Sequence, residues 1–186
     1  MAERTLSAKA ESRVKYWTEA MTEGMESSLE FGAGLFAYVK ASKALRRAGI
    51  EAFKPYCDRA LEDPEINGIS VYQGDMRYFE PFMAEKPYHV ALFIDSLEHL
   101  GKEDALDLML RCQEQFGRIA VFIPMGVHVQ GPCDDNELQS HLSSWSPKEF
   151  LDLGFSVKPH PTFHWDRPVG NQGAIFAKWD RAEEWR

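Results

Sequence analysis

The sequence holds only three cysteines, Cys57, Cys112 and Cys133, and they are too widely spaced to form a CxxC pair. An odd number of isolated cysteines argues against a disulfide framework and against a structural zinc site built on paired thiolates. Such cysteine usage is typical of a reducing compartment, and we expect a cytoplasmic protein. The opening residues MAERTLSAKAESR lack the apolar stretch of a secretion signal, which favours the same expectation.

Long hydrophobic runs and an excess of basic residues are missing too. No apolar run approaches the roughly 20 residues that span a bilayer, so we expect no membrane partner. The 21 Lys and Arg residues face 29 Asp and Glu, which gives a formal net charge of −8. This balance argues against nucleic acid as a partner through a broad electrostatic surface and leaves room only for a local basic groove. The length of 186 residues suits one globular domain.

Apolar runs alternate with amphipathic segments along the chain. Strands are expected at residues 28–32, 50–53, 69–75, 89–95, 118–124, 155–161 and 173–179. Helices are expected at residues 8–25, 35–48, 55–62, 102–116 and 146–153. Strands that alternate with helices imply a parallel sheet wound on both faces, and the short link 162–172 implies that the last two strands pair antiparallel. The sequence therefore predicts an α/β three-layer sandwich, with a doubly wound, seven-stranded, mostly parallel sheet and an antiparallel C-terminal edge hairpin.

Two of the expected helices carry detailed assignments. Helix 35–48 is expected to end at Gly49, after the basic residues Arg46 and Arg47. The buried side of helix 102–116 is expected to hold Leu106, Met109, Leu110 and Phe116. The first helix belongs to residues 1–25, which we expect to form a helical flank or lid on a single domain of residues 26–186.

Acidic residues and glycines gather at the expected carboxyl ends of the strands, the edge at which open parallel sheets bind ligands. The residues at these strand ends are Glu30, Gly32, Gly34, Glu51, Gly74, Asp75, Met76, Asp95 and Ser96. Glycines let the backbone approach a ligand closely. A carboxylate at the end of the second strand is placed to accept both hydroxyls of a ribose, which we favour for Glu51 over a solvated surface acid. Asp75 suits contact with an adenine edge or, alternatively, a simple turn.

The pattern E-x-G-x-G, an acid after the second strand, G-D-M after the third and FIDSLEHL across the fourth resembles the class I S-adenosylmethionine (SAM)-dependent methyltransferases. The resemblance covers residues 28–180 and is clearest in YQGDMRYFEPF, HVALFIDSLEHLGKEDAL and the segment from VFIPMGVHVQGP to HLSSWSPKEFLDLGF. It implies SAM as the cofactor. It also implies that Glu30, Gly32 and Gly34 hold the methionine part, Glu51 the ribose, Gly74, Asp75 and Met76 the adenine, and that Asp95 and Ser96 face the methyl group.

Two positions depart from the family pattern. Glu51 stands where an aspartate is usual and preserves the charge. Phe36 stands where a third small residue is usual, so its ring either enters the interface between sheet and helix or blocks the loop. Burial of a phenylalanine side chain is worth roughly 1.5–3 kcal/mol, and we therefore expect the ring in the interface and the backbone of residues 32–34 free for the cofactor.

The segment DSLEH places Asp95, Glu98 and His99 on one turn if it is helical. We favour His99 as the catalytic residue, a general base for a hydroxyl acceptor. A hydrogen-bonded structural role for His99 is the main alternative. Some O-methyltransferases of this fold bind a divalent metal with an E-x-x-E-H cluster, for which His141 would be a further ligand here, but a structural cluster without metal ranks above that interpretation.

Two loops extend from the expected site. Residues 127–145 form a polar loop of a length that is typical of functional segments, and the resemblance implies that it lines the acceptor pocket. Trp145 is expected to be a core anchor. Residues 160–168 hold aromatics and histidines that either contact the acceptor or cover the sheet edge.

Three functions compete. The first is a SAM-dependent methyltransferase with a small-molecule or sugar-like acceptor and oxygen as one candidate for the methylated atom. The second is an inactive or regulatory SAM-binding relative. The third is an NAD-dependent oxidoreductase. This sequence lacks the GxGxxG loop and the usable Tyr-x-x-x-Lys pair expected of such an enzyme.

Overall fold

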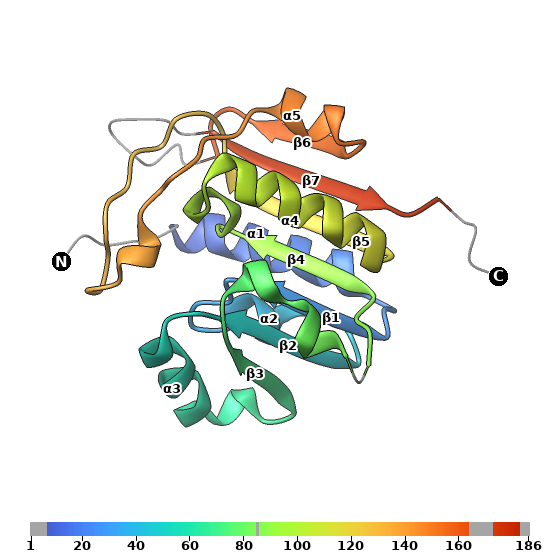
Figure 1. Ribbon diagram of the computed structural model, residues 1–186, viewed down its shortest axis with the longest axis vertical. Helices are drawn as coiled ribbons and strands as arrows, with labels where there is room; N and C mark the ends of the chain where they lie inside the picture. Colours follow the sequence, from blue (N-terminus) through green and yellow to red (C-terminus); the bar gives the residue numbers. More distant parts are fainter. Residues whose placement is uncertain (1–6, 85, 164–172, 183–186) are drawn as a thin grey trace.

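A computed structural model describes residues 7–84, 86–163 and 173–182 of the chain. One sheet runs through this part in the strand order β3-β2-β1-β4-β5-β7-β6 (Figure 1). The strands are β1 (Ser27–Phe31), β2 (Arg46–Glu51), β3 (Ile69–Gln73), β4 (Val90–Ile94), β5 (Arg118–Pro124), β6 (Ser156–His160) and β7 (Ala174–Asp180). Strands β1 to β5 are parallel, and β7 lies antiparallel between β5 and β6. The predicted mostly parallel sheet with its antiparallel terminal pair is confirmed.

Helices cover both faces of the sheet, as Figure 1 shows for α1 behind the strands and α4 in front of them. The α-helices are α1 (Ala8–Thr22), α2 (Ala37–Ala41), α3 (Lys54–Glu62), α4 (Lys102–Gln115) and α5 (Pro147–Asp152). Short 3-10 turns are η1 (Pro64–Ile66), η2 (Met76–Tyr78), η3 (Glu80–Met83), η4 (Leu97–His99) and η5 (Glu137–Gln139). The three-layer sandwich is therefore confirmed. No helix of the described residues is long and apolar enough to cross a lipid bilayer.

The apolar central strands supply the core on both faces. Strand β4 is buried along its whole length, so its alternate side chains enter both layers. On the α4 face, the ring of Phe31 stacks on Phe93 at 4.5 Å and meets Phe116 edge-on at 5.8 Å. On the α1 face, Val14 packs with Phe122 in a separate apolar cluster. The site at the strand ends thus rests on a closely packed sheet.

The expected helix at residues 35–48 is wrong in its second half. Helix α2 ends at Ala41, and β2 begins at Arg46. Gly49 does not stop a helix but lies inside β2, where an added Cβ would come within 2.6 Å of both the Phe36 ring and the Ala33 Cβ. Glycine is needed there because the α2 segment packs directly on the strand, a tertiary reason that helix-stop patterns do not register.

The buried side of α4 also differs from the expectation. Its buried residues are Ala105, Leu108, Met109 and Cys112, the spacing of one helix face. Met109 and Phe116 are buried as expected, and Leu106 is partly buried against the core. Leu110 is 52% exposed, so its assignment to the buried side is wrong.

Phe36 lies in the interface between helix and sheet, as predicted. Its ring is fully buried with Ala33, Val39, Ala60 and Ile66. Its backbone, however, has a left-handed φ of 62° at the start of α2, a conformation that costs an L-residue roughly 1–2 kcal/mol and that glycine adopts freely. The position is thus glycine-like in its backbone and aromatic in its packing.

These two requirements predict that, at position 36, a glycine variant is more stable than an alanine variant, the reverse of the usual order. Phe36→Ala should lower the free energy of unfolding by roughly 3–5 kcal/mol, the usual cost of truncating a buried phenylalanine. Phe36→Gly should be the more stable of the two variants by roughly 1 kcal/mol, because glycine relieves the left-handed backbone. Urea denaturation of both variants measures this difference. A glycine variant less stable than the alanine variant would contradict the argument.

Candidate active site

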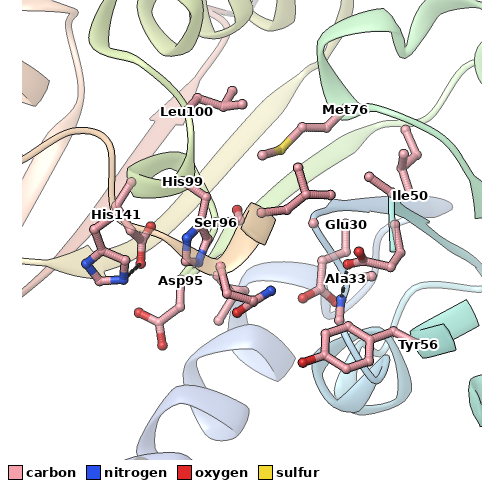
Figure 2. Close-up of a pocket in the computed structure, with 18 of the residues that line it drawn as sticks. Glu30, Ala33, Ile50, Tyr56, Met76, Asp95, Ser96, His99, Leu100 and His141 are labelled. Carbon is pink, nitrogen blue, oxygen red and sulfur yellow. Dashed lines mark hydrogen bonds and ion pairs between the residues drawn. The ribbon is translucent and has the colours of Figure 1, made fainter. Parts of the chain in front are cut away.

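A cavity of about 460 Å³ lies at the carboxyl ends of β1 to β4. Figure 2 shows Glu30, Asp95, Ser96 and His99 around it. Every site residue expected from the sequence lines this cavity: Glu30, Gly32, Gly34, Glu51, Gly74, Asp75, Met76, Asp95, Ser96 and His99. Glu98 and His141 also line it. The fold thus brings together residues that lie more than a hundred positions apart in the sequence.

The two glycines of the first loop serve different purposes. Gly32 has a φ of 69°, and an added Cβ would come within 2.8 Å of the Ser96 Cβ. Gly32 therefore permits close contact between the ends of β1 and β4. Gly34 has a φ of 54°, and its missing side chain would meet no atom within 4 Å. Gly34 leaves the wall of the cavity open, and Phe36 is not part of that wall.

Glu51 ties the first loop to the end of β2. One carboxylate oxygen accepts a 2.8 Å hydrogen bond from the Gly34 N–H, and the other accepts a 2.7 Å bond from the Phe53 N–H. The residue is buried, so the alternative of a solvated surface acid is wrong. A carboxylate oxygen has two acceptor sites, and each oxygen of Glu51 keeps one for a ligand in the cavity.

Glu30 is a buried carboxyl group at the floor of the cavity. Burial raises the pKa of Glu30 well above its ordinary value; a backbone hydrogen bond at Val39 opposes the shift, and the nearby charge of Glu51 adds to it. Its Oε2 has no hydrogen-bond partner among the described residues, and the same holds for the Oγ of buried Ser96. Buried polar atoms without partners are costly, so both atoms are suited to contact a bound ligand.

Asp75 begins the turn η2, as the turn interpretation expects. Its carboxylate accepts a 2.9 Å bond from the Arg77 N–H and a 2.6 Å bond from the Arg77 guanidinium, which also reaches Asp104 at 2.9 Å. The Arg77 hydrogen bonds lower the pKa of Asp75. Preceding Gly74 packs under the Phe82 ring, which an added Cβ would approach within 2.6 Å. The side chain of Asp75 is thus engaged with Arg77 while its segment lines the cavity.

The opposite end of the cavity holds Glu98, His99 and His141. One ligand-type atom from each lies within 4.8 Å of the others, an arrangement that can hold a metal ion. The Nδ1 atom of His99 lies 3.2 Å from the Ser140 carbonyl, and that of His141 lies 2.7 Å from the His128 carbonyl. Donation from Nδ1 to these carbonyls leaves each Nε2 as the basic atom. Asp95 lines the cavity but lies outside this cluster.

The strand-end residue Asp95 has a left-handed φ of 47°, and its N–H donates a 2.9 Å bond to the Phe122 carbonyl. A non-glycine residue in this region is strained, and such strain concentrates at functional sites. The turn directs the chain from β4 into η4, which carries Glu98 and His99. The sheet therefore fixes the position of both residues.

The segment 127–145 contributes to the lining of the cavity, with His128, Asp134 and His141 among its lining residues. Tyr56 at the start of α3 donates a 2.7 Å hydrogen bond to Asp134, which joins this segment to α3. Gln130 and Gln139 also line the cavity. The family resemblance implied that this segment lines a pocket, but no sequence signal identified Tyr56 as its contact.

The two remaining expectations concern Trp145 and the final loop. Trp145 is buried and stacks on Phe150 at 5.0 Å, so its role as a core anchor is confirmed. In the loop of residues 160–168, Phe163 packs into the apolar cluster on the α1 face and covers the sheet there. Residues 164–168 lie outside the described residues.

The chain matches no protein-family model and no curated relative. Its structure is similar to the small RNA methyltransferase HEN1, with a TM-score of 0.69, 14% sequence identity and coverage of 99% of this chain. The chain spans only 27% of the length of that protein. The CcbJ methyltransferase from Streptomyces caelestis has a TM-score of 0.64 and 17% identity, over 93% of this chain and 89% of its own.

A third similar structure is the N-terminal domain of EvdMO1 with S-adenosylhomocysteine (SAH) bound, which has a TM-score of 0.66 and 14% identity, over 95% of this chain and 83% of its own. All of these likenesses extend over at least 93% of this chain, so they describe its whole architecture. The chain therefore has the Rossmann-like fold of the class I SAM-dependent methyltransferases.

Proposed function

We propose that this protein is a SAM-dependent methyltransferase that acts on a small-molecule or sugar-like acceptor. One observation carries the proposal: a single cavity joins the acid-and-glycine wall at the ends of β1 to β3 to the cluster formed by Glu98 and His99, which follow β4, and His141. Residues suited to a cofactor and a group able to handle a proton thus line one cavity. Fold alone does not establish an activity, so the site must carry the argument.

The wall suits SAM chemically. SAM supplies an electrophilic methyl group on a positively charged sulfonium. The carboxylate of Glu51 gives this end of the cavity a negative charge that favours the sulfonium and ammonium charges, and the unpartnered Oε2 of Glu30 lies in the same lining. Glu51 retains acceptor sites for ribose hydroxyls, and Met76 with the segment of Gly74 and Asp75 suits the adenine. Asp95 and Ser96 lie next to the cluster that would face the acceptor. SAH in the similar EvdMO1 structure supports the same cofactor.

A hydroxyl acceptor would need to lose a proton during transfer, and His99 is the group we assign to that step. Its Nδ1 is anchored on the Ser140 carbonyl, which turns the basic Nε2 toward the cavity. His141, anchored in the same way on the His128 carbonyl, lies beside it with a ring-centre distance of 5.0 Å.

The same cluster also fits a divalent metal ion. Metal-binding histidines usually donate their second ring N–H to a carbonyl or carboxylate, the arrangement found at both His99 and His141. Glu98 would add a carboxylate oxygen. A bound ion would act as a Lewis acid on an acceptor oxygen. His99 would then be a ligand rather than the base, and metal titration separates these roles.

The acceptor side of the cavity is polar. Buried Gln139 lines it, and the Oε1 of this residue has no hydrogen-bond partner within the described residues. An oxygen that can accept a hydrogen bond favours a ligand that carries hydroxyl groups. Among similar structures, the EvdMO1 domain was crystallised in the presence of SAH and D-fucose. Glu11 of α1 contributes to the same wall, which supports residues 1–25 as a flank of the site on a domain of residues 26–186.

The alternatives lose support at particular positions. An inactive relative would be favoured by a ring of Phe36 in the cavity, but that ring is buried elsewhere. An NAD enzyme would need a third glycine in the first loop for close packing of helix on strand, and Leu35, Phe36 and Ala37, the residues that follow Gly34, supply none. We place the protein in the cytoplasm on its cysteine usage.

Ligand selectivity tests the proposal directly. SAH at 100 times its dissociation constant should stabilise the protein by roughly 2.7 kcal/mol, which corresponds to a rise in melting temperature of roughly 5–10 °C. NAD and NADP should have no effect. Differential scanning fluorimetry with each ligand at millimolar concentration measures the shift. A shift with NAD and none with SAH would reject the methyltransferase.

The two ends of the cavity should respond differently to mutation. Glu51→Ala should weaken SAH binding by roughly 1.5–3 kcal/mol, the worth of hydrogen bonds to a charged group, which is about 10- to 150-fold in affinity. His99→Ala should leave SAH affinity within about twofold and abolish turnover. Isothermal titration calorimetry gives both affinities, with Glu51→Gln as a control that keeps the side-chain shape.

Titration of the same variants with Mn²⁺ separates the two roles of His99. If the cluster holds a metal, His99→Ala and His141→Ala should both lose Mn²⁺ binding while Glu51→Ala retains it. If wild-type protein binds no Mn²⁺, His99 is the base. An exchange of effects, with SAH affinity lost in His99→Ala and kept in Glu51→Ala, would refute the placement of the cofactor.

Glu30 should reveal a conflict between stability and binding. Because the pKa of Glu30 is raised in the folded protein, its protonated form contributes to the free energy of unfolding. This contribution is fully present below the unfolded-state pKa of Glu30 and is lost as the pH rises through its folded-state pKa. Glu30→Gln cannot ionise, so without ligand it should melt above wild type at about pH 8, and this advantage should vanish near pH 4. Its melting shift with SAH should be smaller, because the cavity loses an acid. Equal melting curves at both pH values would contradict the argument.

A further inference from the structure

A second hollow of about 620 Å³ lies on the other side of α1, between this helix and the β6–β7 pair. We call it the α1 groove. It is lined by Lys9, Ser12, Arg13, Tyr16, Trp17, Ala20 and Met21 of α1 and by Ser156, Val157, Lys158, His160, Phe176, Ala177 and Lys178 of the two strands. It shares no lining residue with the cavity at the strand ends. Along α1 it extends from Lys9 to Met21, about 18 Å at the helical rise of 1.5 Å per residue.

The charge of the α1 groove is opposite to that of the protein. Lys9, Arg13, Lys158 and Lys178 line it, and no acidic residue of the described chain does. The chain as a whole has a formal net charge of −8. One of the four cations, Lys178, forms a 2.6 Å ion pair with Asp180. A local basic surface on an acidic protein indicates an anionic ligand at that place.

The floor of the groove is aromatic. Trp17 packs edge-on against Phe176 with a ring-centre distance of 5.1 Å, and the Tyr16 side chain at the rim is 74% exposed. The His160 ring meets Phe176 at 5.2 Å. Burial, together with the charges of Arg13 and Lys158, lowers the pKa of His160, so its ring is favoured in the neutral form at physiological pH. Flat apolar rings therefore lie between the cations.

Arg13 connects these two features. Its guanidinium lies 4.6 Å from the centre of the Phe163 ring, and its Nη2 lies 3.4 Å from the His160 Nδ1. Within the part of the chain that the structure describes, the guanidinium is thus held at the groove by the rings of Phe163 and His160. Lys158 is placed on the facing strand β6, so cations stand on both walls.

We propose that the α1 groove binds a single-stranded nucleic acid. Sites for single strands combine a positively charged groove that follows the phosphates with aromatic side chains on which bases stack, and the α1 groove provides both. A duplex would hide the base faces that Tyr16 is exposed to contact. The proposal does not depend on methyl transfer, because the two sites share no lining residue.

The test is fluorescence anisotropy with a labelled 12-nucleotide single-stranded oligonucleotide, RNA and DNA, at 50 to 200 mM NaCl. We expect binding that weakens with salt, with a slope of log affinity against log salt of about −0.7 for each phosphate contacted. Arg13→Glu/Lys158→Glu should weaken binding at least tenfold and make the slope shallower by about 1.4. Tyr16→Ala should weaken it about fivefold or more, through lost stacking, and leave the slope unchanged.

The matched control is Lys86→Glu/Lys148→Glu, which makes the same change in net charge outside the groove. Circular dichroism and melting curves verify the fold of every variant. Equal losses in the two double variants, or no binding by wild type at 50 mM NaCl, would overturn the proposal. Displacement of the oligonucleotide by SAH would place it in the strand-end cavity instead and also overturn it. Binding of oleate but not of the oligonucleotide would identify the groove as a lipid site.

Discussion

The bidentate contact of Glu51 with the backbone fixes the geometry on which the site depends. This carboxylate holds the Gly34 N–H and the Phe53 N–H at the same time, so the loop after β1 and the start of α3 are joined at the end of β2. Both bonds are charge-assisted and partly buried, which makes them stronger than ordinary backbone contacts. They add to the hydrogen bonds that the Gly32 and Ala33 N–H groups donate to the Ile50 carbonyl, so the first loop is held on β2 from both its backbone and the Glu51 side chain.

Close packing carries this constraint outward through three glycines. Gly32 admits Ser96, Gly49 admits the Phe36 ring, and Gly74 admits the Phe82 ring, each at a distance where a Cβ would collide. These three glycines allow neighbouring elements to pack closely. Gly34 differs from them, because a Cβ added there would meet no atom within 4 Å. The cavity is therefore shaped by how tightly the loops and strands approach one another.

Much of the fold and most of the site follow from sequence patterns because those patterns are local. Strand β5 has the expected bounds, since a continuous apolar run between polar ends permits little else. The strand-end residues could be placed in one cavity because parallel strands end at the same edge of a sheet. The failures at Gly49 and Leu110 have one cause: the burial of each residue depends on which partner packs against it, and that information is distributed over distant segments.

The site residues that sequence reasoning missed share this origin. The contact of Tyr56 with Asp134 joins positions 78 apart, and the α1 groove is built from the first helix and the last two strands. The net charge of the chain allowed a local basic groove but could not locate it. The cations of the α1 groove are isolated along the chain and form no linear motif. Such features exist only once the sheet is assembled.

The insertion of β7 between β5 and β6 has a consequence for biosynthesis. Strand β6 leaves the ribosome before β7, yet its hydrogen-bonding partner is β7 and not β5. Until residues 174–180 are made, the edge of β5 and the apolar side chains of Phe122 and Ile123 have no strand to cover them. A chain that folds during translation therefore has an open sheet edge until then, a state prone to association with other chains. Pairing of β7, the last described strand, thus covers the edge of β5 and joins β6 to the sheet in one step.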